Sequence, residues 1–260
     1  MTLDIGKIIY SASGIKTKPN SLSLERGLQK ALDKRSDFLI RDTFEASAEN
    51  IGFSYVNRPS YSIFSKPADK NNIMSMGSFR STGLVDINKY FLMEAKANKN
   101  ALGGYLETIH TINHELRHFV QGVLVVKDRG FEGFLSKFAW IPHEIRFMSP
   151  KFKMDVLNKH YSRGLYERAA SELPALTEKD RKLVSDIMSY KNYNNRDKDG
   201  KISAEYLNDP AEKDANDFAS KATNEIRQTI QAPSKVESLS DFVGRSFESL
   251  SNKVDKFLAA

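Results

Sequence analysis

The spacing of apolar side chains changes along the chain and separates segments of different predicted secondary structure. Apolar residues recur near the helical period between residues 21 and 50, which predicts a long helix there. Residues 52–93 instead hold short apolar runs separated by Pro, Asn and Gly, a pattern typical of strands. After two consecutive glycines the helical period returns over 104–126. The apolar positions of the first helix are Leu24, Leu28, Leu32, Phe38 and Phe44, and the expected strands are 61–65, 73–77 and 83–88.

The second half of the chain is predicted to be mostly helical. Several short helices are expected within 130–200, one of them opened by a capping box of Thr177 and Asp180. A longer helix is predicted over 209–231, because Asp and Pro at its start suit the N-cap and the first helical position. The segment 237–260 is expected to form an amphipathic helix. Its apolar side, over 243–257, would either pack on its own domain or bind a partner or a second copy.

This order of a helix, a small sheet and then more helices predicts an α+β fold. A chain of 260 residues suits one main domain, expected over 1–232, with the amphipathic helix following it. The sheet is expected to be small and mixed, with an edge strand beside the helix over 104–126.

Composition limits the chemistry that this domain can use. The chain has no cysteine, so disulfides and thiolate sites are excluded and any metal must be held by His, Asp or Glu. The net charge of +6 arises from basic residues scattered among acidic ones, which makes a nucleic-acid partner an unfavoured interpretation. The longest strongly apolar run, 123–126, is far below the roughly 20 residues of a membrane helix. With no signal-peptide pattern at the N-terminus, we expect a cytoplasmic protein without a membrane partner.

The predicted helix over 104–126 carries a pattern with metal-binding spacing, His114-Glu115-Leu-Arg-His118. Residues four apart lie one turn above each other, so both histidines can reach one ion. Glu115 is rotated by about 100° and suits a base that contacts the attacking water rather than a ligand. The alternative is an ordinary surface helix with two histidines. His110 extends the same stripe by one turn and is expected to support the site or to face solvent.

The third ligand must come from elsewhere in the chain. Glu212 and Asn216 lie on the predicted helix over 209–231 in the order Glu-x-x-Ala-Asn, with the small Ala215 allowing another helix to approach. Asn216 could accept the ring N–H of a ligand histidine and fix its tautomer. Glu212 would equally well serve as a capping residue, and Glu144 and Glu167 are rival ligands.

The combination of a strand at 83–88, the His-Glu-x-x-His helix and the later Glu-x-x-Ala-Asn helix resembles the gluzincin class of zinc metallopeptidases. The stretch 212–219 is similar to the third-ligand helix of the compact ImmA/IrrE-like peptidases. The resemblance covers about 82–122 and 205–222. It implies that 83–88 is the edge strand beside the cleft, where a substrate would add as a further strand. The region 130–200 would then be a helical insertion.

These residues predict a zinc-dependent peptidase that acts on a protein or peptide substrate. Three protein ligands leave one position on the ion for water, and Glu115 would take the proton from that water and deliver it to the leaving amine. The developing oxyanion needs a further donor, which the sequence does not select. The candidates are Tyr193, Tyr206, His110, His143 and Arg117.

A second ion site is conceivable in the polar stretch before the last ligand. Asn195, Asp197 and Asp199 alternate as in the first half of a calcium loop, and Gly200 follows at the sixth position. The twelfth position, usually a bidentate Glu, is Tyr206. A plain polar turn is therefore the competing interpretation of this stretch.

Two other functional classes remain open at this point. One is a regulatory or binding protein whose metal site is degenerate or structural. The other is a virion-associated structural protein in which the histidine pattern is fortuitous and the segment 243–257 drives assembly.

Overall fold

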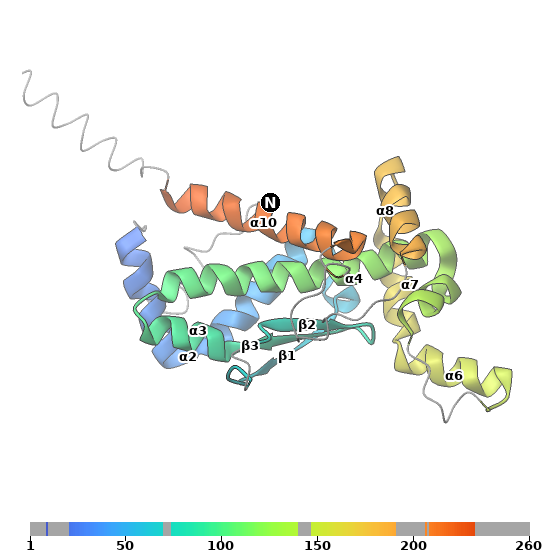
Figure 1. Cartoon of the computed structure of the whole chain (residues 1–260), viewed down its shortest axis with the longest axis horizontal. Helices are drawn as coiled ribbons and strands as arrows, with labels where there is room; N and C mark the ends of the chain where they lie inside the picture. The colour runs from blue at the N-terminus through green and yellow to red at the C-terminus, as the bar shows by residue number, and fades with distance from the viewer. Residues whose placement is uncertain are drawn as a thin grey trace, which may run out of the picture.

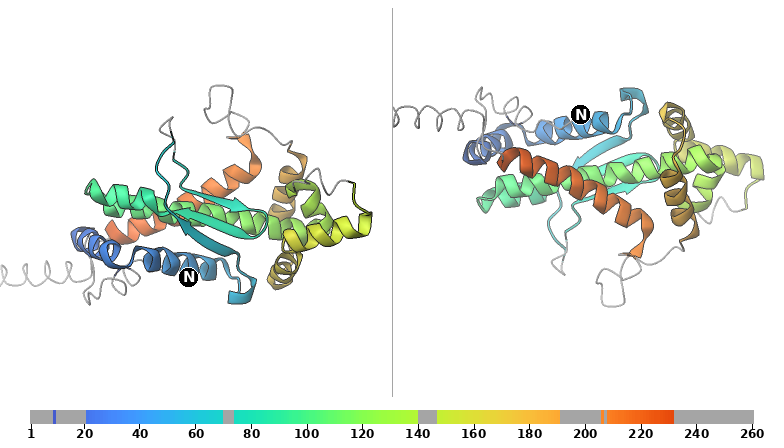
Figure 2. Two further views of the ribbon diagram at one scale, coloured as in Figure 1. Left: turned by 90° about the horizontal axis from the view of Figure 1, so that it is seen from below. Right: turned by 90° about the horizontal axis from the view of Figure 1, so that it is seen from above.

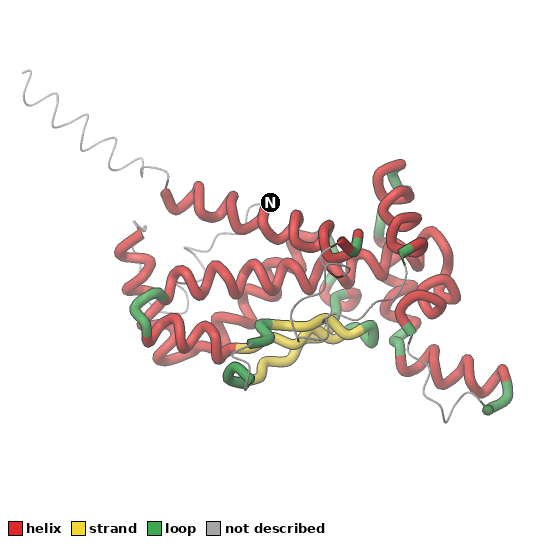
Figure 3. Tube along the Cα trace, in the orientation of Figure 1, coloured by secondary structure: helices red, strands yellow, loops and turns green. Residues whose placement is uncertain are grey.

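The computed structural model describes residues 9, 21–69, 74–139, 147–190, 206 and 208–231, and within them the chain has an α+β fold (Figure 1). A small sheet is the only strand region in this part of the chain, and helices make up nearly all of the rest (Figure 3). In order, the elements are α2 (Ser21–Ile51), the 3-10 turn η1 (Tyr55–Asn57), β1 (Ser60–Phe64), β2 (Gly77–Arg80), β3 (Leu84–Asn88), α3 (Lys89–Ala97), α4 (Ala101–Phe138), α6 (Pro150–His160), α7 (Arg163–Glu172), α8 (Glu178–Ser189) and α10 (Pro210–Gln231).

Helix α4 is the central element of the molecule. It lies between the sheet, which covers one side, and α10, which crosses the other side (Figures 1 and 2). Its apolar stripe, predicted from the sequence, is buried throughout, and it belongs to two core clusters. The first half of α4 packs with α2, α3 and the sheet, and the second half packs with α7 and α8. The stripe consists of Ile109, Ile112, Leu116, Phe119 and Val123.

The sheet has the order β1-β3-β2, with β3 parallel to β1 and antiparallel to β2. The prediction that the strand at 83–88 forms the edge was therefore wrong, because β3 is the central strand. The edge strand beside α4 is β2, which lies just after the expected run at 73–77 and shares only Gly77 with it. The physical reason lies in the side chains: Val85 and Ile87 of β3 are fully sheltered, whereas β2 reads Gly-Ser-Phe-Arg and tolerates an open edge.

Two predicted helices differ from the expectation in their phase or length. Phe38 of α2 was expected in the core but is 52% exposed, while Leu39 and Ile40 are buried. Arg35 has non-helical backbone angles (φ −153°, ψ 42°), so the helix restarts after it and presents a different face to the core. Helix α4 begins earlier and ends later than 104–126, and it turns at Gly130, where φ is +72°.

Three predicted features of the second half are present in the structure. The expected short helices are α6, α7 and α8, and Thr177 and Asp180 form the capping box at the start of α8. Asp209 caps α10 by accepting a hydrogen bond from the Ala211 N–H at 2.8 Å.

The segment 237–260 and its apolar positions lie outside the described residues. Among the described helices, none has both the length and the apolar character needed to cross a bilayer.

Lys127 of α4 forms hydrogen bonds with the C-terminal end of α7. Its ammonium group donates to the carbonyls of Ala170 and Leu173 at 2.9 and 2.6 Å, at the point where α7 ends. The last carbonyls of a helix have no partner within the helix, so this lysine satisfies groups that would otherwise lack one.

We expect Lys127→Met to lower the free energy of unfolding by about 1–3 kcal/mol, because two partly buried carbonyls lose a charged donor. Denaturant unfolding followed by circular dichroism measures this change. Lys182→Met on the exposed side of α8 is the control and should change stability by less than about 0.5 kcal/mol. Equal stability of the two variants would contradict the assigned role.

Candidate metal centre

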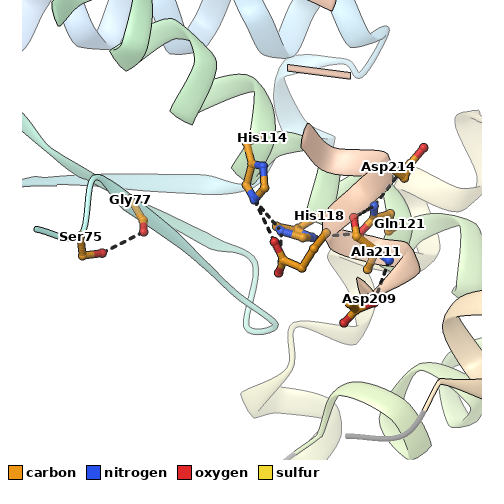
Figure 4. Close-up of polar contacts among 9 residues, drawn as sticks. Ser75, Gly77, His114, His118, Gln121, Asp209, Ala211 and Asp214 are labelled. Atoms are coloured by element: carbon orange, nitrogen blue, oxygen red, sulfur yellow. Dashed lines mark hydrogen bonds and ion pairs between the residues drawn. The ribbon is translucent and has the colours of Figure 1, made fainter. Parts of the chain in front are cut away.

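His114 and His118 converge on one point beside the middle of α4. Their rings are half-buried and meet edge to face, with centroids 4.7 Å apart and an angle of 84° between the planes. The two Nε2 atoms are 3.1 Å apart (Figure 4). The helical spacing of four residues produces this convergence directly, as the sequence predicted.

Helix α10 brings Glu212 to the same point. Its Oε2 atom lies 3.3 Å from His114 Nε2, and its Oε1 atom lies 3.5 Å from His118 Nε2. Ligands at 2.0–2.1 Å from a tetrahedral ion are separated from one another by about 3.3 Å. The three donor separations of 3.1, 3.3 and 3.5 Å match this value, so these side chains fit a small tetrahedral ion.

The Glu212 carboxylate lacks a full set of partners in the protein itself. Its Oε2 atom is buried and accepts no hydrogen bond, since the His114 ring is close to it but does not donate to it. Burial alone would raise the pKa of Glu212, but the close contacts with His114 and His118 and a hydrogen bond with Tyr206 hold it well below its usual range. A charged and buried carboxylate oxygen without a donor is the kind of atom that a cation would satisfy.

Glu115 lies beside the two histidines, between them and the sheet. The ligand atoms of His114, Glu115 and His118 all lie within 4.8 Å of one another, and this cluster can hold a metal ion. The Glu115 carboxylate is buried, and the nearby backbone N–H of Phe79 on β2 acts to lower its pKa. Burial raises the pKa of Glu115, although His118 and His114 act in the opposite direction.

The edge of β2 faces this carboxylate. Asn88 N–H donates to the Met76 carbonyl at 2.8 Å, so Met76 and Asn88 form a hydrogen-bonded pair of the antiparallel ladder. The alternate residues Gly77 and Phe79 therefore turn their backbone groups away from β3 and towards the open edge. The contact from Phe79 N–H to Glu115 agrees with this, as does the Ser75 hydroxyl that donates to the Gly77 carbonyl at 3.1 Å.

Of the remaining predicted residues, three lie at the site. Tyr206 forms a hydrogen bond with Glu212, and burial together with this bond raises the pKa of Tyr206 far above its usual value. Asn216 lies near His110 and acts to raise the pKa of that ring, whereas Nδ1 of His118 lies 2.9 Å from the amide oxygen of Gln121. His110 stacks against His114 with centroids 6.4 Å apart, and burial lowers its pKa.

Two predicted candidates are used elsewhere. Arg117 is not an oxyanion donor in this structure, because its guanidinium group pairs with Asp214 at 2.7 Å and covers the ring of Phe218. Glu167 forms an exposed ion pair with Arg163 at 2.7 Å on α7, so it is not a third ligand here. Tyr193, His143, Glu144 and the calcium-loop residues Asn195, Asp197 and Asp199 lie outside the described residues.

Gln121, which contacts both His118 and α10, was not among the residues predicted from the sequence. The available signal was a polar residue three positions after the second histidine, where the apolar stripe would otherwise continue.

Comparison with protein-family models, with curated proteins and with solved structures finds no significant match. The interpretation of the site therefore depends on its own geometry.

Gly77 is needed because β2 and α4 approach closely at this position. A Cβ atom on residue 77 would lie 2.6 Å from Thr111 Cγ2 and 3.0 Å from the Asp86 carbonyl. We expect Gly77→Ala to cost about 1–3 kcal/mol of stability, because the strand must move away from the helix. Denaturant unfolding gives the value, and Gly164→Ala, which meets only the end of a flexible arginine, serves as the control. An unchanged stability for Gly77→Ala would show that this approach is not a constraint.

Glu212 should be required for metal binding. Purified protein reconstituted with zinc and analysed by mass spectrometry is expected to hold about one ion per chain, and Glu212→Ala should lose it, because two histidines alone leave a weak site. Glu225→Ala on the exposed side of α10 is the matched control. Retention of the full zinc content in Glu212→Ala would exclude this carboxylate as a ligand.

Proposed function

We propose that the protein is a zinc-dependent peptidase whose site is formed by His114, His118, Glu212 and Glu115. The observation that carries this proposal is the convergence of three donors at 3.1–3.5 Å with a second, buried carboxylate adjacent to them. This second carboxylate lies beside Phe79 N–H of the edge strand β2. A metal site, a base and an open strand edge at one place suit the hydrolysis of an extended peptide by metal-activated water.

The donor set favours zinc among the common metals. Two imidazoles and one carboxylate suit a tetrahedral site, and three protein ligands leave one position open, as in catalytic rather than structural zinc sites. When bound, such an ion lowers the pKa of a water molecule and polarises the substrate carbonyl. His114, His118 and Glu212 would hold it, and the remaining steps fall to other side chains.

Glu115 is the proposed general base. It would accept a proton from the attacking water and deliver that proton to the leaving amine. Its burial supports this role because a carboxylate with a raised pKa is a better proton acceptor than an exposed one. The carboxylate lies close to Phe79 N–H of the edge strand, so Glu115 stands between the histidines and the sheet.

An extended peptide would bind along the open edge of β2. The outward backbone groups of Gly77 can pair with a substrate strand, which is the usual way in which a peptide adds to a sheet. Ser75 would have to release the Gly77 carbonyl to the substrate, and its exposed side chain is free to turn away. Tyr206 and His110 are the candidate oxyanion donors at the site among the described residues. The Tyr206 hydroxyl contacts Glu212 and would have to turn from it to the oxyanion.

The proposal predicts that Glu115→Gln binds zinc as tightly as the wild type but loses cleavage of a peptide library by at least about 100-fold, the scale expected for a general base. Zinc content and product formation by mass spectrometry are both measured. Glu107→Gln, an exposed glutamate two turns earlier on α4, is the matched control and should cleave normally.

Undiminished cleavage by Glu115→Gln would remove Glu115 from the mechanism. Zinc binding without cleavage of any peptide or protein by the wild type would instead favour a regulatory or structural metal site.

A further inference from the structure

Gln121 occupies the boundary between the metal centre and the interface of α4 with α10. It is the residue one turn after His118, and only 1% of its surface is exposed. Its amide nitrogen donates to the Ala211 carbonyl and to Asp214 Oδ2, each at 2.8 Å. Its amide oxygen lies 2.9 Å from Nδ1 of His118 (Figure 4).

These contacts fix the orientation of the Gln121 amide. The Ala211 carbonyl and the Asp214 carboxylate can only accept, so the NH₂ group must face them and the oxygen must face His118. A flipped amide would bring its oxygen against two other oxygens. A buried amide with both N–H groups satisfied therefore has a single favourable orientation.

The orientation of the amide in turn decides the tautomer of His118. An amide oxygen is an acceptor, so Nδ1 of the ring must carry the hydrogen that lies between them. In the neutral ring the lone pair is then on Nε2, which faces His114 and Glu212. This is the form of histidine that binds a metal through Nε2.

The chain of contacts continues beyond Gln121. Asp214 accepts two hydrogen bonds from Arg117, of 2.7 and 3.1 Å, and the guanidinium group lies over the ring of Phe218. Arg117 and Gln121 belong to α4, whereas Ala211, Asp214 and Phe218 belong to α10. The partners that orient the Gln121 amide are therefore supplied entirely by the docked α10.

We propose that Gln121 is a positioning residue of the metal centre, through which the docking of α10 on α4 holds His118 as its Nδ1–H tautomer with Nε2 directed at the ion. From the sequence, this role was expected of Asn216, but the partner of His118 Nδ1 is Gln121. The inference rests on the metal-binding part of the proposed function and does not depend on peptide cleavage.

A merely structural role for Gln121 makes a different prediction. If the amide only joined two helices, its loss would lower stability but would leave the ring of His118 and the metal affinity unchanged. The tautomer of His118 therefore separates the two roles, and it can be observed in the protein without any metal.

The first experiment uses Gln121→Leu in the full chain, which keeps the approximate size of the side chain and removes the acceptor. Ring nitrogen NMR of protein with ¹⁵N-labelled histidine, in alkaline buffer where the rings are neutral, reports the tautomer of His118. Zinc affinity is measured in parallel by competition with a chromogenic chelator. We expect the wild type to show Nδ1 protonated and Nε2 unprotonated, and Gln121→Leu to show a mixture of tautomers. We expect zinc affinity in Gln121→Leu to fall by about 10–100-fold, as for other residues that orient a ligand.

A second variant keeps the test decisive if Gln121→Leu does not fold. Asp214→Ala removes one of the two acceptors that orient the amide, while the Ala211 carbonyl remains. We expect a detectable share of the other tautomer and a loss of zinc affinity of less than about tenfold. Asp217→Ala, an exposed aspartate on the same helix, is the matched control and should match the wild type in both measurements.

The outcomes that overturn the proposal are distinct from a failure of the enzyme. A wild-type His118 protonated at Nε2 would overturn it, as would folded Gln121→Leu with an unchanged tautomer and zinc affinity within about threefold of wild type. A protein that binds zinc, shows the expected shifts and cleaves nothing would retain this inference while losing the peptidase proposal.

Discussion

The packing of α10 against α4 is the constraint on which the rest of the site depends. Three alanines on α10 are buried against the central helix, and their small side chains let the two backbones approach closely. Only this approach carries Glu212 to within 3.3–3.5 Å of two histidines far earlier in the chain. The alanines are Ala211, Ala215 and Ala219.

The opposite side of α4 is constrained in a comparable way by the sheet. Gly77 lets β2 lie against the helix, and Phe79 N–H then reaches the carboxylate of Glu115. The two carboxylates near the histidines thus lie on different helices, Glu212 on α10 and Glu115 on α4 beside the edge strand. Burial raises the pKa of Glu115, whereas the contacts of Glu212 with His114, His118 and Tyr206 outweigh burial and depress its pKa.

The buried polar side chains near the site have partners either within α4 or on α10. Most of the helix is buried among aliphatic and aromatic side chains, and the burial of an unpaired polar group there would be costly. Thr108, Thr111 and Asn113 donate to carbonyls one turn earlier on α4 itself. Arg117 and Gln121 instead donate to α10, to Asp214 and to the Ala211 carbonyl. At the site, the Oε2 atom of Glu212 is buried without a hydrogen-bond donor, so a cation would satisfy it.

What the sequence determined by itself was local. The spacing of His114 and His118, the apolar stripe of α4, the capping residues of α8 and α10 and the α+β order all follow from periodicity and short-range hydrogen bonding. Glu212 could also be nominated, because its helix has a recognisable start and a stripe of small residues.

Only the tertiary structure decided which segments meet. Strand β3 became central and β2 the edge, because pairing depends on contacts between strands and the sequence of each strand is compatible with more than one position. The kink at Arg35 moved Phe38 to the surface, since a break in a helix changes its phase. Gln121 lies three residues after His118 on the same helix, but the orientation of its amide depends on the Ala211 carbonyl and Asp214 of α10. The order of the strands and the orientation of this amide are set by packing between residues far apart in the chain, which no local pattern encodes.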